Sequence, residues 1–502
     1  MKRYLPFITL LVCAITSAQN INDVLRYSTE NLQGTARFQS MSGAFGALGG
    51  DLSALNANPA GSAVFNHSIF TVSGTNYNKD NTVNYNGTLR NLSPSYLNIN
   101  QAGGALVFKS TNQDSGWSKF TLAFNYDTVE NYENEYVASG RSNQGIDTYF
   151  LDFAQGVPFG DIEIRDGEFI EDAYLDIGRS LGFVDQQAFL GVVGGIINPT
   201  TTDANNTTYN SNAIYNSVNQ QFLRITSGQN NKFTLNAASA YENKLYIGAS
   251  LNFHSILYDQ LDEFTETGYD STSEIQRTIF DNRLHTEGAG FSFNVGAIAK
   301  LNNVVRIGAS YQSPTWYRLT DELAQRIDSD SDSTNENINF INFNIINQFE
   351  SYTVKTPAKL TGSLALIFGK NGLLSLDYGY QDMSQASLSP NNSDFDFTNE
   401  NINSQLGSVT SVRVGGEFRI QKISLRGGYR FEGSPYENGD LISDLEGISA
   451  GIGYNFGGSR LDFSINRSER DIAQTFFDSG ITDTALINTI NTNATLSYTL
   501  NF

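Results

Sequence analysis

Apolar and polar residues alternate along most of the chain after residue 67, with the period of two that is typical of a half-buried β-strand. The clearest example runs from residue 245 to residue 254, where Leu, Ile, Ala, Leu and Phe alternate with Tyr, Gly, Ser, Asn and His. The pattern predicts fourteen strands, near residues 68–76, 95–110, 117–132, 231–241, 243–258, 286–300, 303–318, 352–368, 372–384, 410–420, 422–432, 446–456, 459–469 and 492–502.

Short and long connections between these strands also alternate. Tight turns such as Glu242-Asn243 and Gly457-Gly458 follow every second strand, and long loops near 133–230, 259–285, 319–351 and 385–409 follow the others. An even strand count, with short turns at one end and long loops at the other, is typical of bacterial outer-membrane barrels. We therefore predict an all-β fold, a 14-stranded antiparallel transmembrane β-barrel with long extracellular loops.

The two ends of the chain agree with a location in the outer membrane of a Gram-negative bacterium. Residues 1–18 read as a secretory leader, with Lys2 and Arg3 before an apolar core and cleavage after Ala18. Leu10 to Cys13 superficially resembles a lipoprotein signal, but the large Val12 disfavours lipidation. At the other end, the segment 495–502 alternates and finishes on an aromatic residue, like the C-terminal signal of outer-membrane barrels.

Composition fits the same picture. Charged residues make up 17% of the chain and the mean hydropathy is mildly negative, because barrel strands hide their apolar content by alternation. The chain has 31 basic and 52 acidic residues, and loss of Lys2 and Arg3 with the leader would leave 29 against 52, a formal charge of −23. This excess argues against nucleic acid as a partner. The single cysteine, Cys13, would leave with the leader.

A Gly/Ala-rich segment, residues 43–61, precedes the first strand and has five glycines and five alanines. Glycine tolerates positive φ, so such a segment can fold back on itself in a confined space. We expect residues 19–66 to form an N-terminal hatch, or plug, and residues 67–502 to form the barrel. The loop 133–230 is too long for a plain connection, and its parts 145–156 and 171–197 read as helical.

Several motifs resemble those of the FadL/TodX family of outer-membrane transporters for hydrophobic compounds. Asn58-Pro59-Ala60 resembles the NPA signature of the family's hatch, and 305–314, 356–360 and 412–430 are similar to its strand motifs. The resemblance implies passive diffusion of long-chain fatty acids or aromatic hydrocarbons through a hatch-plugged barrel, with lateral exit into outer-membrane lipid. It implies no cofactor and no metal.

The resemblance also assigns candidate site residues. The hatch or gating residues would be Gly43, Gly46, Gly49, Gly50, Asp51, Asn58, Pro59 and Gly61. Contacts to a hydrophobic small-molecule ligand would come from Phe45, Leu48, Leu52, Leu55, Arg413 and Arg426. For each set an alternative to ligand contact stays open. The four apolar residues could pack against the barrel wall, and the arginines could form ion pairs with lumen carboxylates such as Glu417 and Asp377.

Other functions have less support. A FadL-like barrel that serves as a surface protein-binding scaffold, or as a shuttle for surface or secretion-system proteins, is the main alternative, and a general porin is a weaker one. Asp328 to Asp332 begins like a calcium loop, but Ser333 stands where that loop needs glycine, so we expect a solvated acidic loop. The chain has no nucleophile elbow, HExxH motif or P-loop, and we expect no enzymatic activity.

Overall fold

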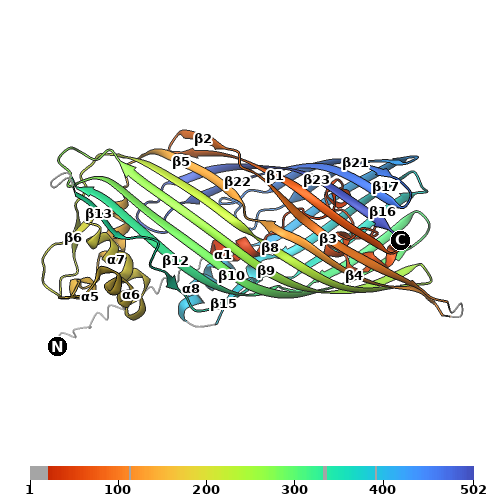
Figure 1. Ribbon diagram of the computed structural model, residues 1–502, viewed down its shortest axis with the longest axis horizontal. Coiled ribbons are helices and arrows are strands. Elements are labelled where there is room, and N and C mark those ends of the chain that lie inside the picture. Colours follow the sequence, from red (N-terminus) through yellow and green to blue (C-terminus); the bar gives the residue numbers. More distant parts are fainter. Residues whose placement is uncertain (1–20, 112–114, 332–335, 391–392) are drawn as a thin grey trace, which may run out of the picture.

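The computed structural model describes residues 21–111, 115–331, 336–390 and 393–502, so the predicted leader lies outside the described residues. It is an elongated, closed antiparallel barrel with a group of helices at one end and the C-terminus near the other (Figure 1). The fourteen wall strands confirm the predicted fold class: β1 (Ile69–Tyr85), β3 (Ser95–Lys109), β4 (Trp117–Asn131), β8 (Val218–Tyr241), β9 (Leu245–Thr267), β10 (Ile275–Lys300), β11 (Val305–Gln312) with β12 (Trp316–Ser331), β15 (Tyr352–Lys355) with β16 (Lys359–Phe368), β17 (Gly372–Asp382), β19 (Ser408–Ile420), β20 (Ile423–Glu432), β21 (Leu445–Asn455), β22 (Ser459–Thr475) and β23 (Thr484–Asn501).

Each wall strand pairs with the next, and β1 pairs with β23 from Ile69↔Asn501 onward, which closes the barrel. Two of the wall strands are broken once. Pro314 lies between β11 and β12, and Pro357 lies between β15 and β16. Proline has no N–H to give to a ladder, so a strand that contains it bends or stops there.

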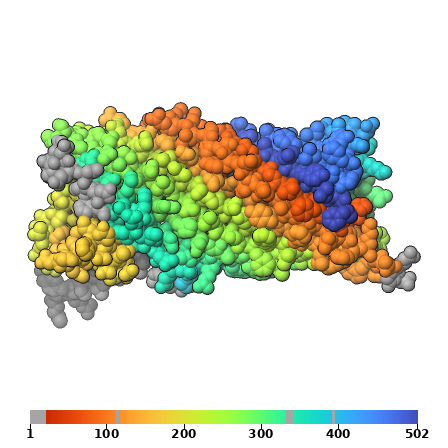
Figure 2. Space-filling view, viewed as in Figure 1, coloured from red at the N-terminus to blue at the C-terminus, as the bar shows by residue number. Residues whose placement is uncertain are grey.

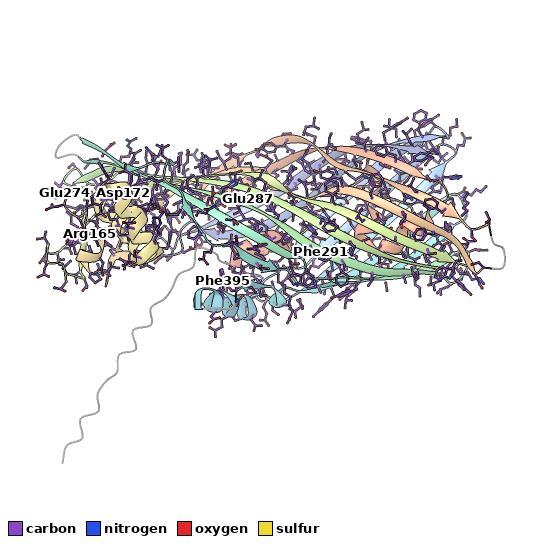
Figure 3. All side chains as sticks on the ribbon, turned by 60° about the horizontal axis from the view of Figure 1, so that its bottom comes forward. Arg165, Asp172, Glu274, Glu287, Phe291 and Phe395 are labelled. Carbon is purple, nitrogen blue, oxygen red and sulfur yellow. The ribbon has the colours of Figure 1, made fainter. Side chains whose placement is uncertain are left out.

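The outer face of the barrel is apolar at its periplasmic end and charged further out. On β9, Leu251 and Phe253 are exposed while Asn252 and His254 are buried, as the alternation predicts. Along β10 the outward side chains change from Phe291 to Glu287, and Figure 3 shows Glu287 closer to the helical end. A band of apolar outward residues on a closed barrel faces lipid. We therefore place the outer boundary of the membrane between these two positions.

Several wall strands continue beyond that boundary and are longer than predicted. The strands β8, β9 and β10 have 24, 23 and 26 residues, whereas β17, β20 and β21 have 11, 10 and 11. The expected acidic loop is wrong for Asp328 to Ser331, which lie in β12 paired with β10. Arg277 of β10 forms a two-bonded ion pair with Asp330, so this carboxylate has a partner within the sheet.

The long loop forms a cap at the outer end (yellow in Figure 2). Its main elements are β5 (Asn134–Ser142), α4 (Ile146–Ala154), α5 (Phe159–Ile162), α6 (Ile170–Ser180), α7 (Phe183–Val193), β6 (Ile197–Pro199) and β7 (Tyr209–Ser211). The apolar run at residues 190–197 is buried or half-buried, with Leu190, Ile196 and Ile197 fully inaccessible. It packs among the outer ends of the wall strands, so its apolar surface is used within the molecule.

The remaining elements lie inside the barrel or along its rim. The lumen contains α1 (Ile21–Ser28), α2 (Ala36–Gln39), α3 (Ala54–Ala57) and the 3₁₀ helix η1 (Pro59–Val64). Rim elements are β2 (Thr88–Leu92), β13 (Glu336–Ile341), β14 (Asn347–Gln348), η2 (Met383–Gln385), β18 (Ser387–Ser389) and α8 (Ser393–Gln405). None of the helices in the described ranges is both long and apolar enough to cross a membrane.

Candidate functional site: the hatch and the barrel wall

Residues 21–66, which we call the hatch, lie inside the barrel lumen (Figure 1). All eight predicted hatch residues lie in this segment, and seven of them are buried while Gly50 is half-buried. Gly49 and Gly50 have positive φ angles of 60° and 69°, and a Cβ on Gly49 would lie 2.7 Å from the Cα of Gly61. The turn at 49–50 and the 3₁₀ helix η1 therefore meet backbone to backbone, which explains why this region needs glycine.

Asn58 attaches the hatch to two neighbouring strands. Its side-chain amide nitrogen donates to the carbonyl oxygen of Gly46 at 2.8 Å and to that of Ala297 in β10 at 3.0 Å. The carbonyl oxygen of Ala309 in β11 lies 3.3 Å from the same nitrogen. Its side-chain oxygen accepts from the N–H of Ala60, so one asparagine both starts η1 and joins the hatch to the wall.

Asp377 of β17 holds the middle of the hatch. Its carboxylate accepts hydrogen bonds from the backbone N–H of Phe45 at 2.9 Å and from that of Gly46 at 2.9 Å. Two adjacent N–H groups pointing at one carboxylate form a charge-assisted contact, which is stronger than a neutral hydrogen bond. The position of Gly46 is also sterically fixed, because a Cβ there would lie 2.0 Å from the Ser363 hydroxyl.

A buried network of ion pairs fixes the other side of the hatch. Arg37 of α2 approaches Glu417 of β19 with 3.1 Å between Nε and Oε2. Glu417 also pairs with Arg426 of β20 at 2.6 Å, and Arg426 continues to Asp462 of β22 at 2.7 Å. The side chains of Glu417 and Arg426 are each 1% exposed. Asp51 of the hatch joins the network through Arg37 at 4.0 Å.

Glycines on the inner face of the wall let the hatch backbone approach closely, and the sequence analysis gave them no such role. A Cβ on Gly308 of β11 would lie 2.3 Å from the carbonyl oxygen of Gly46. The same crowding against the hatch occurs at Gly248, Gly296, Gly415, Gly428 and Gly451. A glycine inside a strand often marks such an approach, but sequence alone does not name the segment that approaches.

Gly308→Ala is expected to weaken the hatch–wall contact and to destabilise the folded protein by about 1–3 kcal/mol, because the new methyl group overfills a packed contact. The folded and unfolded barrels would be separated by gel mobility after incubation in increasing urea. Gly362→Ala on the neighbouring strand β16 is the matched control, because a Cβ there meets nothing within 4 Å. Equal urea midpoints for the two variants would contradict the prediction.

The predicted ligand-contact residues lie in two different environments. Phe45, Leu48, Leu52 and Leu55 are buried between the hatch and the inner wall, and Phe45 also lies against the guanidinium of Arg37. Arg426 belongs to the ion-pair network. For these five residues the observed contacts match the packing and ion-pair alternatives, and their role toward a ligand stays a prediction.

Arg413, by contrast, borders a cavity of about 60 Å³ between the hatch and the wall. Glu30 of the hatch, Lys232 of β8 and Lys359 of β16 line the same cavity. Burial raises the pKa of Glu30, but the nearby Lys359 and Lys232 outweigh it and hold the pKa at about 2. At roughly 10–15 Å³ of accessible volume per water molecule, this space has room for about four to six waters. In this arrangement the cavity is polar and the lumen is plugged.

The wall beside this cavity has an interruption in its hydrogen bonding. The β3–β4 ladder runs from Lys109↔Lys119 to Gln101↔Asp127. Within the described ranges, residues 95–99 of β3 pair only with β1, and Asn100 lies at a shift in that register. Side chains span the interruption, with Asn98 donating to Gln229 of β8 at 2.9 Å. We call this stretch, residues 95–100 facing 128–131, the wall gap.

The hatch lies directly behind the wall gap. The Asn31 amide donates to Glu130 at 2.6 Å, the Tyr77 hydroxyl donates to Gln33 at 2.7 Å, and the Asn100 amide donates to the Gly34 carbonyl at 2.8 Å. Asn31 and Gln33 also line the 60 Å³ cavity. Hatch residues 31–34 therefore separate the cavity from the gap.

Comparison with known proteins agrees with this architecture. The structure of a Pseudomonas aeruginosa FadL homologue superimposes with a TM-score of 0.55 at 12% identity, covering 95% of this chain and 100% of that one. The toluene transporter TodX of Pseudomonas putida gives 0.50 at 14% identity, with 95% and 100% coverage. Residues 13–93 match the profile of an uncharacterised protein family (UPF0164). No curated protein gives a significant sequence match.

These likenesses confirm, at the level of the fold, the resemblance that the sequence motifs indicate. A closed barrel with an even strand count and an apolar outer band is an outer-membrane protein, as predicted.

Proposed function

We propose that this barrel takes up hydrophobic compounds across the outer membrane, with the hatch as its gate and the wall gap as a lateral exit into lipid. The proposal rests on one observation above all: the wall gap is closed from inside by hatch residues 31–34, which are held by side-chain hydrogen bonds, instead of by a strand. The similar P. putida structure is that of a toluene transporter, and toluene is a hydrophobic compound of the class proposed here.

Physical chemistry favours a sideways route for such solutes. An apolar molecule gains about 0.8 kcal/mol for each CH₂ group that it removes from water. A route that ends in lipid keeps this gain, whereas a water-filled pore would require the molecule to return to water on the far side. Passive diffusion down a concentration gradient is then sufficient, and the plugged lumen excludes polar solutes.

The lining of the gap fits an apolar solute that leaves outward. On β3, the outward side chains Leu97 and Ile99 are 81% and 59% exposed, so they face the lipid side of the gap. Asn98 and Asn100 bind across it or to the hatch. Displacement of residues 31–34 would break the hydrogen bonds to Glu130 and from Asn100, while the β3–β4 ladder nearer the periplasmic end stays intact.

An uptake assay tests this function. Cells that lack their own transporters for these compounds would express the full chain, and uptake of radiolabelled palmitate and toluene would be compared with that of a disaccharide. We expect uptake of the apolar solutes to rise several-fold over cells with an empty vector, with no change for the disaccharide.

Faster uptake of all three solutes would instead indicate a general pore. Unchanged uptake together with stoichiometric capture of a surface protein would favour the scaffold alternative.

A further inference from the structure

The barrel wall has a second interruption, far from the wall gap, where the short strands end. Beyond Asp382↔Ser408 the β17–β19 ladder stops, and the chain continues as η2 and β18. Strand β18 pairs on one side with β15, at Leu388↔Val354, and its other side carries no strand among the described residues. Helix α8 lies there instead, beside the barrel in Figure 3, where Phe395 is labelled.

Helix α8 replaces the missing strand by side-chain hydrogen bonds. The Asn399 side-chain oxygen accepts from the N–H of Leu388 at 2.8 Å, and its nitrogen donates to the carbonyl of the same residue at 3.0 Å. One asparagine thus satisfies both backbone groups of Leu388 at this edge. Unlike a ladder of many bonds, this attachment is short and can open locally.

The inner face of α8 covers an apolar interior. Phe395, Ile402 and Leu406 are at most 7% exposed, and they pack in one cluster with Val24 and Leu25 of α1. The rings of Phe395 and Tyr352 lie 6.0 Å apart. On the outer face, Phe397 is 70% exposed. The helix therefore separates α1 of the hatch from the surroundings by a single layer of side chains.

The position of α8 matches the outer boundary of the membrane. In Figure 3, α8 lies level with Glu287, on the capped side of Phe291. An opening at this depth would admit molecules that gather at the lipid–water boundary.

Two separate small cavities lie between the hatch and the wall near α8. A cavity of about 20 Å³ is lined by Met383 and Val409 next to α8 and by Ser28 of α1. Glu30 and Lys359 line this cavity and also the 60 Å³ cavity beside the wall gap. The packing along this line is incomplete, and a shift of α8 and α1 would join the two spaces.

We propose that α8 is a second gate, through which apolar solutes enter from the outer boundary of the membrane. The inference rests on the proposed uptake function. It adds the place where solutes enter the barrel, whereas the wall gap is the place where they leave. Its ligand class is the small hydrophobic compound, uncharged or with a single charged head group, that partitions from water into the membrane.

Locking α8 in place tests the proposal. The double variant Tyr352→Cys and Phe395→Cys removes two neighbouring rings and places one cysteine in β15 and one in α8. A short, reducible, bifunctional thiol linker can then join the two cysteines in the space of the rings. We expect the linked double variant to lose uptake of palmitate and toluene, and to regain it on reduction. Each single variant treated with the same reagent is the control, because it carries the modification without the link.

A second measurement follows the opening itself. Val24→Cys, buried below α8, would be labelled by a thiol reagent, and Asn399→Ala is expected to increase the labelling rate several-fold. Asn403→Ala, an exposed site on the same helix, is the matched control. Uptake that continues unchanged in the linked variant, or equal labelling in the two asparagine variants, overturns the second gate. Absence of uptake in the unmodified protein overturns the proposed function itself, and the gate with it.

Discussion

Glu417→Ala is expected to release the hatch from one side of the barrel and to open the lumen to ions and small polar solutes. The substitution removes the carboxylate that Arg37, Arg419 and Arg426 share. Among the carboxylates of the described residues, Arg426 then keeps only Asp462, and Arg37 keeps only Asp51 at 4.0 Å. Breaking a buried ion pair in this way costs about 3–5 kcal/mol. The wall ladders on both sides of β19 stay intact, so the loss falls on the contact with Arg37.

Conductance in planar lipid bilayers measures this effect, since the wild-type lumen is plugged and the variant lumen is not. Protease cleavage within residues 21–66 provides a second readout of the released hatch. Glu446→Ala, an exposed carboxylate on β21, is the control for a general effect of charge removal. Arg37→Ala combined with Glu417→Ala should cost less than the sum of the two single variants, because they remove the same contact. A Glu417→Ala protein with wild-type conductance would contradict the prediction.

The membrane-spanning strands could be predicted from sequence because lipid outside and a polar hatch inside impose opposite demands on alternate residues. This signal disappears where strands leave the membrane. Glu266 of β9, Asp281 of β10 and Gln220 of β8 are all buried under the cap, although each is polar. Buried and exposed residues still alternate there, but the buried ones are polar, so apolar and polar residues do not alternate. The sequence pattern therefore predicts loops for the outer halves of these strands.

The hatch could be predicted from its own composition, but its partners could not. Arg37 and Glu417 are 380 residues apart in the chain, and no local pattern relates them. The apolar residues at positions 45–55 are compatible both with packing against the wall and with ligand contact. Only the fold shows which contacts these residues make. Among the arginines, Arg426 has two carboxylate partners while Arg413 borders a cavity, although both occupy similar strand patterns.

The wall gap left no clear trace in the sequence either. Tyr96, Leu97, Asn98 and Ile99 alternate as in any other wall strand. The interruption arises because the β1–β3 register shifts between Ser73 and Gly74, next to Asn100, whose side chain binds the hatch. Pairing defects of this kind depend on two or three strands together, and a pattern read along one strand does not contain them.

A reducible link across the wall gap is expected to stop uptake of hydrophobic compounds. Asn98→Cys and Gln229→Cys replace two side chains that already meet at 2.9 Å, and a short bifunctional thiol linker would hold β3 against β8. If solutes leave through this gap, linked cells should take up palmitate and toluene no faster than cells without the protein. Reduction of the linker should restore the original rate.

The matched control places the same link where the wall is already continuous. Leu106 of β3 and Leu122 of β4 are directly opposed in the ladder, and both are exposed toward lipid. Cysteines at these positions can be linked between two neighbouring strands, yet the link adds nothing that the backbone hydrogen bonds do not already enforce. Equal loss of uptake in both linked proteins would show that the linker itself interferes. Unchanged uptake in the gap-linked protein would mean that solutes leave by a different route, and the hatch would then have to open toward the periplasm.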